Sequence, residues 1–470
     1  MIEVGKKTAS LNKTTYRYST RSNTGEKRLM KVIIVGATKT GFHIAQNLSN
    51  EGHSIVFIDN REEVLHQATN SLDVLTILGD GSSHRVLEEG GIKGSDFFTA
   101  VTNDDRVNIL ASLLAKVYGV PKVVVRISDP EHLDNPLLLK EKGLYTVYPE
   151  KVVADKIAQL IEVPFATLSE VFGEGRVRIL KLEVKKGSAL EGKKLGELER
   201  LSSWILIALS RGGKLTIPRG DTLIQAGDYV IGLGIKEALK ELERLVGPPE
   251  PRTKRVVILG GGRIGYYLLK ELSGRGIFLR LIETSSQRSL ELAQELSHVL
   301  VFKGDGTSGE VLKEAGVEEA DYFVALTRDD EINVLASLCA KNLGCKKVII
   351  LSRKRDYTPI VEKVGIDVAI NPPLAAASEV MRYIRGEKVL SLSLLEEGKG
   401  EILEVLVKED SKIAGKVLRD TAFPEEALIG AIVRKHNIII PRGDTTILPN
   451  DRVIVLTLPQ AIKKVEKLFG

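Results

Sequence analysis

The sequence is poor in cysteine and lacks long apolar runs. Its two cysteines, Cys339 and Cys345, fall in one predicted helix, six residues apart. At that spacing they point to different faces, so the pattern argues against a disulfide between them and offers no metal-binding arrangement. Apolar runs such as 204–209 are too short to cross a bilayer, and the N-terminus lacks the apolar core of a secretory signal. We therefore expect a reducing compartment, no metal site and no membrane span.

The excess of positive charge is confined to one end of the chain. The formal net charge is +5, but residues 1–29 hold seven Lys or Arg residues and two acids, which leaves 60 basic and 60 acidic residues elsewhere. This Thr- and Ser-rich stretch is predicted to be a disordered arm. A basic arm can contact nucleic acid or anionic lipid. Because the rest of the chain is balanced in charge, we interpret the arm as a leader and predict no nucleic-acid partner.

A long segment of the sequence occurs twice. The phrase GDGSSHRVLEEGGI at 79–92 returns as GDGTSGEVLKEAGV at 304–317, and the stretch 31–59 is matched by 255–283. The offset of about 223 to 225 residues is too long for a solenoid repeat and long enough for a hydrophobic core in each copy. The chain is therefore predicted to consist of two similar units, joined by a proline-rich linker at 247–254.

Each unit begins with the pattern of a doubly wound parallel sheet. In the first copy, short runs rich in β-branched residues alternate with helical stretches; the runs lie at 30–36, 53–59, 74–80, 96–102 and 122–128. Runs that are apolar throughout indicate strands buried on both faces. Alternation of such strands with helices predicts an α/β fold with a Rossmann-like parallel sheet, and the second copy repeats it.

The second copy carries a complete G-x-G-x-x-G motif between a strand and a helix. The turn consists of Gly260, Gly261, Gly262, Arg263, Ile264 and Gly265. Gly260 permits the tight turn, Gly262 allows a pyrophosphate to approach the backbone, and Gly265 allows helix and strand to pack closely. The free N–H groups of the helix suit phosphate, and Glu283 at the end of the next strand can accept ribose hydroxyls. This context predicts a nucleotide site.

The first copy departs from the motif at its centre. Its turn consists of Gly36, Ala37, Thr38, Lys39, Thr40 and Gly41. The Thr38 side chain crowds the place where a pyrophosphate would approach, whereas Lys39 can offer a positive charge and Asp59 keeps the acidic position. We predict a nucleotide site here too, less suited to a dinucleotide. The alternative is that this lobe only supports the other.

The repeated GDG phrase follows the third strand, at the carboxyl edge where ligands of such sheets bind. It places Asp80 in the first copy and Asp305 in the second at that edge. Ser82 and Thr307 can cap the helices that follow. A turn with a cap would by itself explain one copy of the phrase, but its repetition favours a role in the site.

The fourth strands end at the same edge. Thr102 and Asn103 end the strand in the first copy, and Thr327 and Arg328 end it in the second. Their side chains either meet a ligand or cap a helix with an acidic first turn. Both interpretations remain open at this point.

These motifs resemble those of the TrkA family, the cytosolic nucleotide-binding subunits of Trk-type potassium uptake systems. The most specific features are the paired GDG turns and the paired IPRGDT segments at 217–222 and 440–445, and the resemblance spans about residues 30–470. It implies two RCK units, each a Rossmann-like lobe followed by a small α+β C-terminal lobe. The implied boundaries are 1–29 for the arm, 30–150 and 151–246 for the first unit, 247–254 for the linker, and 255–375 and 376–470 for the second unit.

The resemblance implies a set of ligand contacts in each unit. In the first unit these are Gly36, Ala37, Thr38, Lys39, Thr40, Asp59, Asp80, Thr102, Asn103 and Arg126. In the second unit they are Gly260, Gly261, Gly262, Arg263, Ile264, Glu283, Asp305, Thr327 and Arg328. Leu351 stands at the position of Arg126 in the second copy, and Arg353 follows two residues later.

The resemblance also implies a function without catalysis. Such proteins bind NAD(H), ATP or ADP and gate an integral membrane potassium-translocating subunit. The implied protein is a cytoplasmic homo-oligomer, from dimer to tetramer, peripheral at the inner face of the cell membrane, whose two units can pair with each other. Asp59 and Glu283 suit free ribose hydroxyls and disfavour a 2′-phosphate, so NADP(H) is not expected.

The sequence leaves two alternative functions open. A duplicated NAD-dependent oxidoreductase needs an acid or base beside the nicotinamide, yet none of the seven histidines recurs at its duplicate position. The repeated PRGDT segments are expected to form β-turns braced by their Arg and Asp rather than catalytic sites. A stand-alone nucleotide sensor without a transporter is the other alternative. The sequence does not choose between NAD(H) and ATP or ADP.

Overall fold

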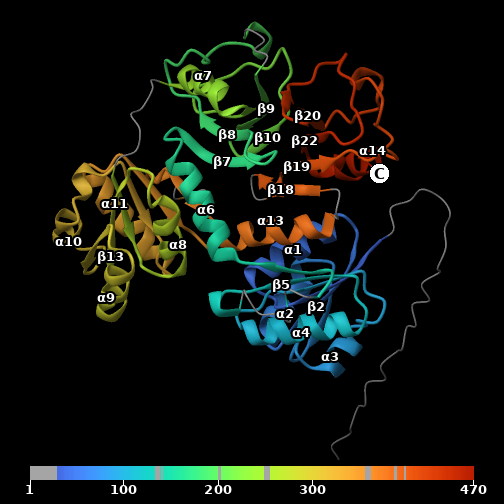
Figure 1. Cartoon of the computed structure of the whole chain (residues 1–470), viewed down its shortest axis with the longest axis horizontal. Helices are drawn as coiled ribbons and strands as arrows, with labels where there is room; N and C mark the ends of the chain where they lie inside the picture. The colour runs from blue at the N-terminus through green and yellow to red at the C-terminus, as the bar shows by residue number, and fades with distance from the viewer. Residues whose placement is uncertain are drawn as a thin grey trace, which may run out of the picture.

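The computed structural model describes residues 29–132, 138, 141–198, 203–247, 255–354, 360, 363–385, 389–395 and 398–469. The predicted arm, apart from its last residue, and most of the predicted linker lie outside the described residues. The described part contains two sheets of six parallel strands and two of five antiparallel strands (Figure 1). This confirms the predicted fold class: two units, each a Rossmann-like lobe followed by a small C-terminal lobe, here called a C-lobe.

The first Rossmann lobe has the strand order β3-β2-β1-β4-β5-β6. Its strands are β1 (Lys31–Val35), β2 (Ser54–Asp59), β3 (Leu75–Leu78), β4 (Phe97–Ala100), β5 (Lys122–Arg126) and β6 (Leu144–Val147). Its helices are α1 (Lys39–Asn50), α2 (Glu62–Ser71), α3 (His84–Glu89) and α4 (Asp105–Val117), with the short 3-10 helix η1 (Pro130–His132). The five predicted strands are present. The sequence interpretation missed β6, in which only the first and last of four residues are buried, so its apolar signal is short.

The second Rossmann lobe repeats this arrangement, with the strand order β14-β13-β12-β15-β16-β17. Its strands are β12 (Arg255–Leu259), β13 (Phe278–Glu283), β14 (Val299–Lys303), β15 (Tyr322–Ala325), β16 (Lys347–Leu351) and β17 (Val368–Ile370). Its helices are α8 (Arg263–Leu272), α9 (Ser286–Glu295), α10 (Gly309–Glu314) and α11 (Asp330–Leu343), with η3 (Val317–Glu319). In both lobes the central strands are buried on both faces, as the continuous apolar runs require.

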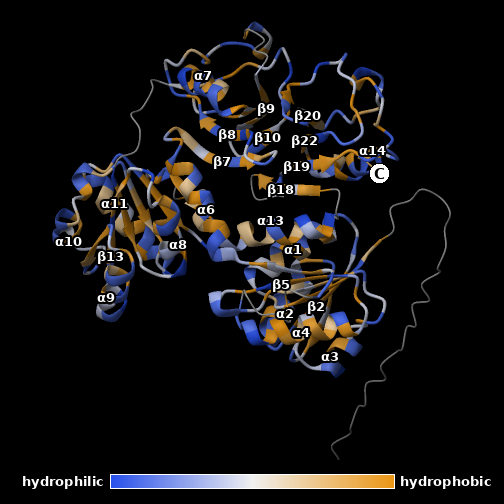
Figure 2. Cartoon of the chain, in the orientation of Figure 1, coloured by the Kyte–Doolittle hydropathy of each residue, from blue (hydrophilic) through white to orange (hydrophobic). Residues whose placement is uncertain are grey.

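The two C-lobes are antiparallel sheets, each closed by one helix. The first contains β7 (Ala166–Phe172), β8 (Val177–Glu183), β9 (Trp204–Arg211), β10 (Lys214–Thr216), β11 (Tyr229–Gly234), α7 (Lys236–Val246) and η2 (Leu195–Glu197). The second contains β18 (Val389–Leu395), β19 (Gly400–Leu406), β20 (Ala427–Arg434), β21 (Asn437–Ile439), β22 (Arg452–Thr457), α14 (Ile462–Phe469), η6 (Leu418–Asp420) and η7 (Pro459–Ala461). Figure 2 shows apolar residues concentrated on the strands and hydrophilic ones on loops and outer helix faces.

The PRGDT segments form turns, but not through the residues expected. In each turn the threonine hydroxyl accepts the arginine N–H, at 2.8 Å for Thr222 and 2.9 Å for Thr445. Asp221 and Asp444 are exposed. The expectation that the Arg and Asp side chains brace the turn was therefore wrong, because the short threonine side chain reaches the backbone directly.

Two crossover helices exchange places between the units. Helix α6 (Pro149–Ile161) follows the first Rossmann lobe but packs on α8 of the second, and α13 (Pro372–Arg385) follows the second Rossmann lobe but packs on α1 of the first (Figure 1). The hydrophobic cores follow this exchange: one unites α6 with the first C-lobe and second Rossmann lobe, another unites α13 with the second C-lobe and first Rossmann lobe. The two units thus pair within one chain.

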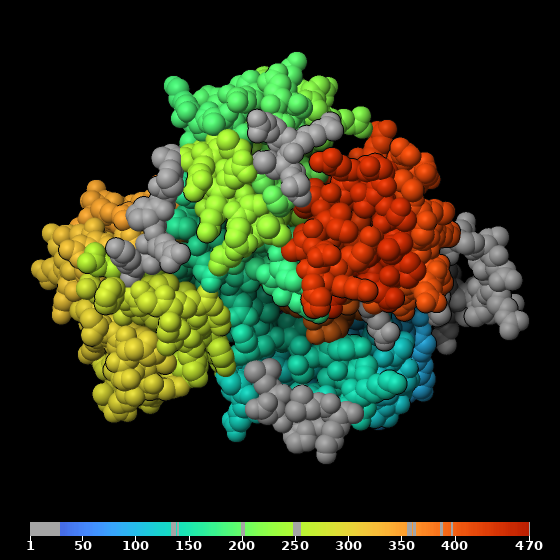
Figure 3. All heavy atoms as spheres, turned by 45° about the horizontal axis from the view of Figure 1, so that its top comes forward, coloured from blue at the N-terminus to red at the C-terminus, as the bar shows by residue number. Residues whose placement is uncertain are grey.

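The two C-lobes also pack on each other through the faces of their sheets. A third apolar cluster joins Ile207, Ile231 and Leu233 of the first to Ile402 and Ile454 of the second. The contact is close, since a Cβ added at Gly430 would come within 2.7 Å of Leu233 Cδ1. Figure 3 shows the two C-lobes side by side, green and red.

Only one of the two cysteines lies in the helix that was predicted to hold both. Cys339 lies in α11, but Cys345 follows the end of that helix, because α11 stops at Leu343 and Gly344 adopts a left-handed conformation. The Cys345 thiol is buried, which raises its pKa to about 12 and makes it unreactive. Among the described residues, no helix has the length and apolar character needed to span a bilayer.

Candidate functional site

The first and last glycines of each turn are required by the backbone. Gly36 and Gly260 have φ of +105° and +104°, a region that favours glycine. A Cβ added at Gly41 would lie 2.2 Å from the Gly36 carbonyl oxygen, and one at Gly265 would lie 2.1 Å from that of Gly260. Both turns therefore hold the helix start against the strand end, as the motif predicts.

The central position of the turn differs between the copies in a way that bears on anion binding. The Thr38 hydroxyl accepts a hydrogen bond from Gly41 N at 3.3 Å and donates one to the Val101 carbonyl at 2.9 Å. It therefore caps α1 and occupies one of the N–H groups that a phosphate would use. Gly262 has no side chain to cap α8, and a Cβ added there would meet no atom within 4 Å. The N-terminus of α8 is the more open of the two.

The two acids predicted to bind ribose lie at the ends of β2 and β13, but only one is held by an arginine. Asp59 accepts hydrogen bonds from Ala37 N at 2.7 Å and from Arg61 Nε and Nη2, both at 2.9 Å. Burial would raise the pKa of Asp59, yet the bonds from Arg61 and Ala37 hold it below its ordinary value. The sequence interpretation missed Arg61, although its position two residues after the acid was a signal.

The carboxylate of Glu283 accepts fewer hydrogen bonds than that of Asp59. Its Oε2 accepts from Gly261 N at 2.7 Å, and its Oε1 accepts from Ser285 N at 2.8 Å. Within the described part of the chain, no Lys or Arg side chain lies at ion-pair distance from Glu283. A ribose hydroxyl would therefore compete with an arginine at Asp59 but not at Glu283.

The GDG turns are built alike in both copies. Asp80 Oδ1 accepts from Ser82 N at 2.8 Å and from the Ser82 hydroxyl at 2.7 Å. In the second copy, Asp305 accepts from the backbone N–H and hydroxyl of Thr307, which lowers the pKa of Asp305. The prediction that Ser82 and Thr307 cap the next helices was wrong, because the residues after them are the N-caps. Their hydroxyls instead orient the two aspartates.

The threonines at the ends of β4 and β15 are held by buried asparagines. Thr102 N and its hydroxyl both donate to Asn108 Oδ1, at 2.9 and 2.7 Å, and Thr327 makes the same pair with Asn333. Each asparagine also donates to the end of the next strand, from Asn108 Nδ2 to the Arg126 carbonyl at 3.1 Å. The sequence interpretation missed both asparagines, although each stands six residues after its threonine.

The arginine predicted at the ligand edge is present in both units, but from different positions. Arg126 Nη1 donates to the Thr102 carbonyl at 3.3 Å and to Asn103 Oδ1 at 3.0 Å. In the second unit Leu351 is buried, and Arg353 Nη1 donates instead to the equivalent Thr327 carbonyl at 3.1 Å. Arg328 is exposed.

Half of the ten first-unit residues predicted at the site line one cavity of about 400 Å³. It opens between the glycine turn, the GDG turn and the end of β4. The predicted ligand residues on its wall are Thr38, Asp59, Asp80, Thr102 and Asn103. Its wall thus combines the carboxylate of Asp59 with Thr38, the N-cap residue of α1.

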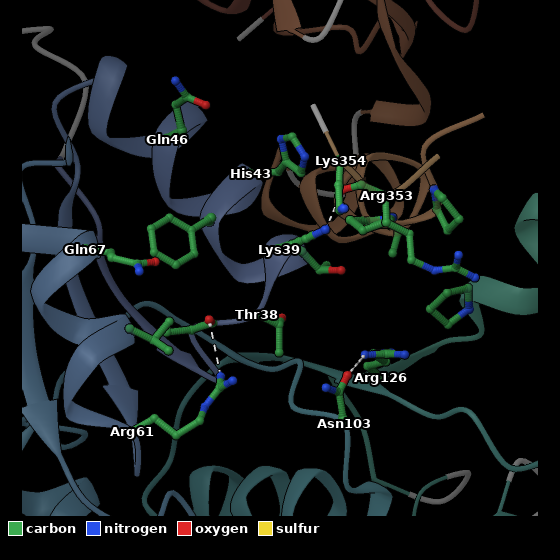
Figure 4. A pocket seen from close by; sticks show the side chains of 18 of the residues that line it. Thr38, Lys39, His43, Gln46, Arg61, Gln67, Asn103, Arg126, Arg353 and Lys354 are labelled. Atoms are coloured by element: carbon green, nitrogen blue, oxygen red, sulfur yellow. Dashed lines mark hydrogen bonds between the residues drawn. The ribbon is translucent and has the colours of Figure 1, made fainter. Parts of the chain in front are cut away.

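A larger cavity, of about 850 Å³, lies beside it between the two units (Figure 4). Thr38, Arg61 and Asn103 line both cavities. The remaining predicted residues on its wall are Ala37, Lys39, Thr40, Arg126 and Ile264. Arg353 and Lys354 of the second unit complete it, so a ligand that extends past the first glycine turn would enter a space lined by cations from both units.

The loops at this cavity are tied across the two units. Lys39 Nζ donates to the Arg353 carbonyl at 2.8 Å, and Arg263 Nη2 lies 3.0 Å from Asp129 Oδ2. Lys39 and Arg263 occupy the same position in the two copies, so the pairing is nearly symmetric. Both cations were predicted as ligand contacts, and both lie at the start of their helix.

Protein-family models show to which family the chain belongs. The model of the TrkA-N domain matches residues 32–148 and 256–372, and that of the TrkA-C domain matches residues 179–247 and 402–470. The chain belongs to the TrkA family. The matched ranges correspond to the two Rossmann lobes and to most of the two C-lobes.

Similar proteins agree with this family. The Trk system potassium uptake protein TrkA homolog 1 of Methanosarcina mazei is 37% identical over 450 residues, which are 94% of this chain and 100% of the relative. The Trk system potassium uptake protein TrkA of Vibrio alginolyticus is 33% identical over 94% of this chain and 98% of its own. Among solved structures, the GsuK channel bound to NAD has a TM-score of 0.60 at 18% identity, over 97% of this chain and 81% of that one. That likeness concerns the fold.

Because of Glu150, at the start of α6, we predict that nucleotide affinity at the larger cavity of this TrkA-family chain depends on pH. Burial raises the pKa of Glu150, and the positive charge of Arg126 opposes that rise only in part. As pH rises through this raised pKa, a negative charge appears on the wall of the larger cavity. We expect Glu150→Gln to strengthen polyphosphate binding there by about 1 kcal/mol, roughly fivefold.

The measurement is nucleotide affinity against pH, from the ordinary pKa range of a glutamate side chain upward. In the parent chain affinity should fall as pH rises across that range, and in Glu150→Gln this fall should disappear. Identical pH profiles for the two chains would contradict the prediction.

Proposed function

We propose that this TrkA-family chain is a regulatory, nucleotide-binding subunit of potassium transport that gates an integral membrane partner. The family membership supports the class of function. The observation that carries the proposal is the exchange of α6 and α13 between the units. Each crossover helix packs on the helix that begins at the other unit's glycine turn, and then leads into its own C-lobe.

The exchanged helices give a physical route for gating. A nucleotide that binds two arrangements of the Rossmann lobes with different affinity shifts their equilibrium. Because α13 lies on α1 and continues into β18, a movement at the first glycine turn is passed to the second C-lobe. The loops that would respond are 79–84, 102–105, 304–308 and 327–330. A transporter docked to the lobes would move with them.

The proposed ligands are NAD(H) and ATP or ADP. The acids Asp59 and Glu283 suit free ribose hydroxyls, and the helix N-termini suit phosphate. The proposed contacts are those predicted from the sequence, joined by Arg61 and Arg353, whose guanidinium groups lie beside the first site. Calorimetric titration with NADH, NAD, ATP and ADP ranks these ligands, and absence of binding to all four would refute the proposal.

The test of the function is potassium flux. The protein and its pore partner are reconstituted in liposomes, and uptake is measured with and without each nucleotide. We expect at least one nucleotide to change uptake in a protein-dependent manner. If the protein leaves uptake unchanged under every nucleotide, the gating proposal is wrong even where binding is confirmed. A parallel assay with NADH tests the proposal that the chain is not an enzyme, since hydride transfer to a substrate would contradict it.

We also propose that the protein is a homo-oligomer, from dimer to tetramer, that acts at the inner face of the membrane. Helices α4 and α11 expose apolar side chains: Leu110 is 48% and Val117 82% exposed, and Leu335 is 54% exposed. Such faces favour contact with another copy, and closed symmetry is the common outcome.

Light scattering should therefore give a mass of at least twice the 51.5 kDa of one chain. Leu110→Asp should lower that mass, whereas Leu290→Asp, on the exposed face of α9, should leave it unchanged. A parent protein that is monomeric at micromolar concentration would contradict the oligomer.

A further inference from the structure

A buried arginine at the end of α13 joins three separate parts of the molecule. Arg385 Nη1 and Nη2 each lie 2.6 Å from a carboxylate oxygen of Glu51, which ends α1 in the first Rossmann lobe. Nη2 also bonds Glu401 of β19 at 2.9 Å, and Nη1 bonds Glu466 of α14 at 3.1 Å. The Arg385 side chain is 2% exposed. We call these four residues the second charge cluster.

The end of α6 carries a comparable group. Glu162, the residue after α6, accepts a hydrogen bond from Arg178 Nη2 of β8 at 2.8 Å. Its other oxygen pairs with Arg275, which follows α8 in the second Rossmann lobe. Burial would raise the pKa of Glu162, yet the hydrogen bond and charge of Arg178 and the charge of Arg275 hold it below its ordinary value. We call these three residues the first charge cluster.

The two clusters occupy duplicate positions with opposite signs. At the offset of about 223 to 224 residues, Glu162 corresponds to Arg385, Arg178 to Glu401, and Glu51 to Arg275. Apart from Glu466, whose duplicate Glu243 is also acidic, each cluster has one residue at the end of a crossover helix, one on the C-lobe that follows it, and one on the opposite Rossmann lobe. All three charges are reversed together, so attraction is retained within each cluster.

This coordinated reversal distinguishes the observed pairing from its alternatives. Because both crossover helices pack in the same way on the opposite lobe, two first units from different chains would place Glu162 against Glu51. Two second units would place Arg385 against Arg275. Like charges at a largely buried contact are strongly unfavourable, whereas the pairing seen here joins opposite charges at both ends.

We propose that the reversed charge clusters determine which units pair, so that a first unit accepts a second unit and rejects a copy of itself. The partner of each first unit is thus a second unit, either of this chain or of another copy with the same reversal. The inference goes beyond the gating function and does not depend on it, since it rests on the contacts between units. Charge reversal of this kind is an ordinary means of excluding wrong partners.

At the other end of the interface, the contact between Arg263 and Asp129 disfavours only one of the two pairings between like units. Asp129 corresponds to Lys354, so two second units would face Arg263 with Lys354. Two first units would face Lys39 with Asp129, which is attractive. Rejection of first-unit pairs therefore depends on Glu162 and Glu51.

Cross-linking in the full chain tests the proposal, with the two native cysteines replaced. The rings of Tyr148 and Tyr267 meet across the α6 interface with centroids 5.2 Å apart, so a chain with Tyr148→Cys and Tyr267→Cys reports the observed pairing. The duplicate of Tyr267 is His43. A mixture of differently tagged chains, one with Tyr148→Cys and the other with His43→Cys, reports pairing of two first units by a cross-link between chains.

Glu162→Arg reverses the preference, since it faces Arg275 in the observed pairing and Glu51 in a first-unit pair. We expect it to lower the 148–267 cross-link and to raise the 148–43 cross-link between chains, so that their ratio changes by about tenfold or more. Adding Arg275→Glu should restore the 148–267 cross-link. The matched control Arg178→Glu removes a partner of Glu162 within its own unit and should not raise the cross-link between chains.

Thermal unfolding gives a second, independent readout. Glu162→Arg and Arg275→Glu should each lower the midpoint, and the double variant should recover most of the loss. The proposal is overturned if Glu162→Arg keeps the parent cross-link ratio, or if Arg275→Glu fails to restore it. Should Glu162→Arg not fold, a double variant no more stable than the weaker single variant overturns the proposal as well.

Discussion

Gly262→Thr is expected to weaken nucleotide binding at the second unit by roughly ten- to a hundredfold, whereas Thr38→Gly leaves binding at the first unit unchanged or stronger. The reason is the competition seen at Thr38, whose hydroxyl accepts the Gly41 N–H. A threonine at 262 would occupy the equivalent N–H of α8, and a charge-assisted hydrogen bond to phosphate is worth about 1.5 to 3 kcal/mol.

The two substitutions are matched, because neither should disturb the fold. A Cβ at position 262 meets no atom within 4 Å, and loss of the Thr38 cap to glycine costs a few tenths of a kcal/mol. Calorimetry that resolves a tight and a weak phase measures the effect, and Gly262→Thr should remove the tight phase.

Substitution of the two acids, Glu283 and Asp59, further tests which unit binds nucleotide more tightly. Glu283→Ala should cost more affinity than Asp59→Ala, since Asp59 is already bound by Arg61. Equal losses from the two substitutions, or a loss on Thr38→Gly, would count against the second unit as the tighter site.

Arg385→Met is expected to destabilise the protein by about 3 to 5 kcal/mol. The arginine side chain is 2% exposed and is held by Glu51, Glu401 and Glu466. Burial raises the pKa of Glu401, and the charge of Arg385 opposes that rise. Without the arginine, two largely buried carboxylates would lose their cation and would take up protons or admit water.

The unfolding midpoint in urea, followed by circular dichroism, measures this effect. Arg219→Met is the matched control, because Arg219 also pairs with a glutamate of the other unit, Glu425, but both side chains are more than two-thirds exposed. That control should change stability by less than about 1 kcal/mol. A shift for Arg385→Met no larger than the control's would contradict the prediction.

The stability lost in Arg385→Met should also depend on pH and on whether Glu401 is replaced by an apolar residue. Below the raised pKa of Glu401 the carboxyl is neutral, so Arg385→Met should be less damaging as pH falls toward that value. Replacing Arg385 and Glu401 together by apolar residues of similar size should recover part of the stability, since no charge is then left unpaired in that pair.

The sequence alone determined the duplication, the fold class and the glycine turn that begins each proposed nucleotide site. Gly36, Gly260, Gly41 and Gly265 are required by local backbone geometry, which depends on a few neighbouring residues and is therefore visible in the motif. The alternation of apolar strands with helices likewise depends on short periods. These features do not require knowledge of which distant segments meet.

The tertiary structure alone decided which side chains share a site. Arg61 forms an ion pair with the carboxylate of Asp59. Arg353 stands two residues beyond the position that matches Arg126, yet it donates to the carbonyl equivalent to the one that Arg126 binds. Side-chain reach and competition among donors are set by packing in three dimensions. A motif records residue type and spacing and carries no information about them.

The exchange of crossover helices was also decided only in three dimensions. The apolar faces of α6 and α13 predict that each helix packs on a sheet or a helix, but the same faces would suit either unit. Arg385 and Glu51 are separated by 334 positions in the chain, and no local pattern relates them. The choice was made by the sum of apolar burial and opposite charges across the two units, because only in the exchanged arrangement does each buried charge meet its partner.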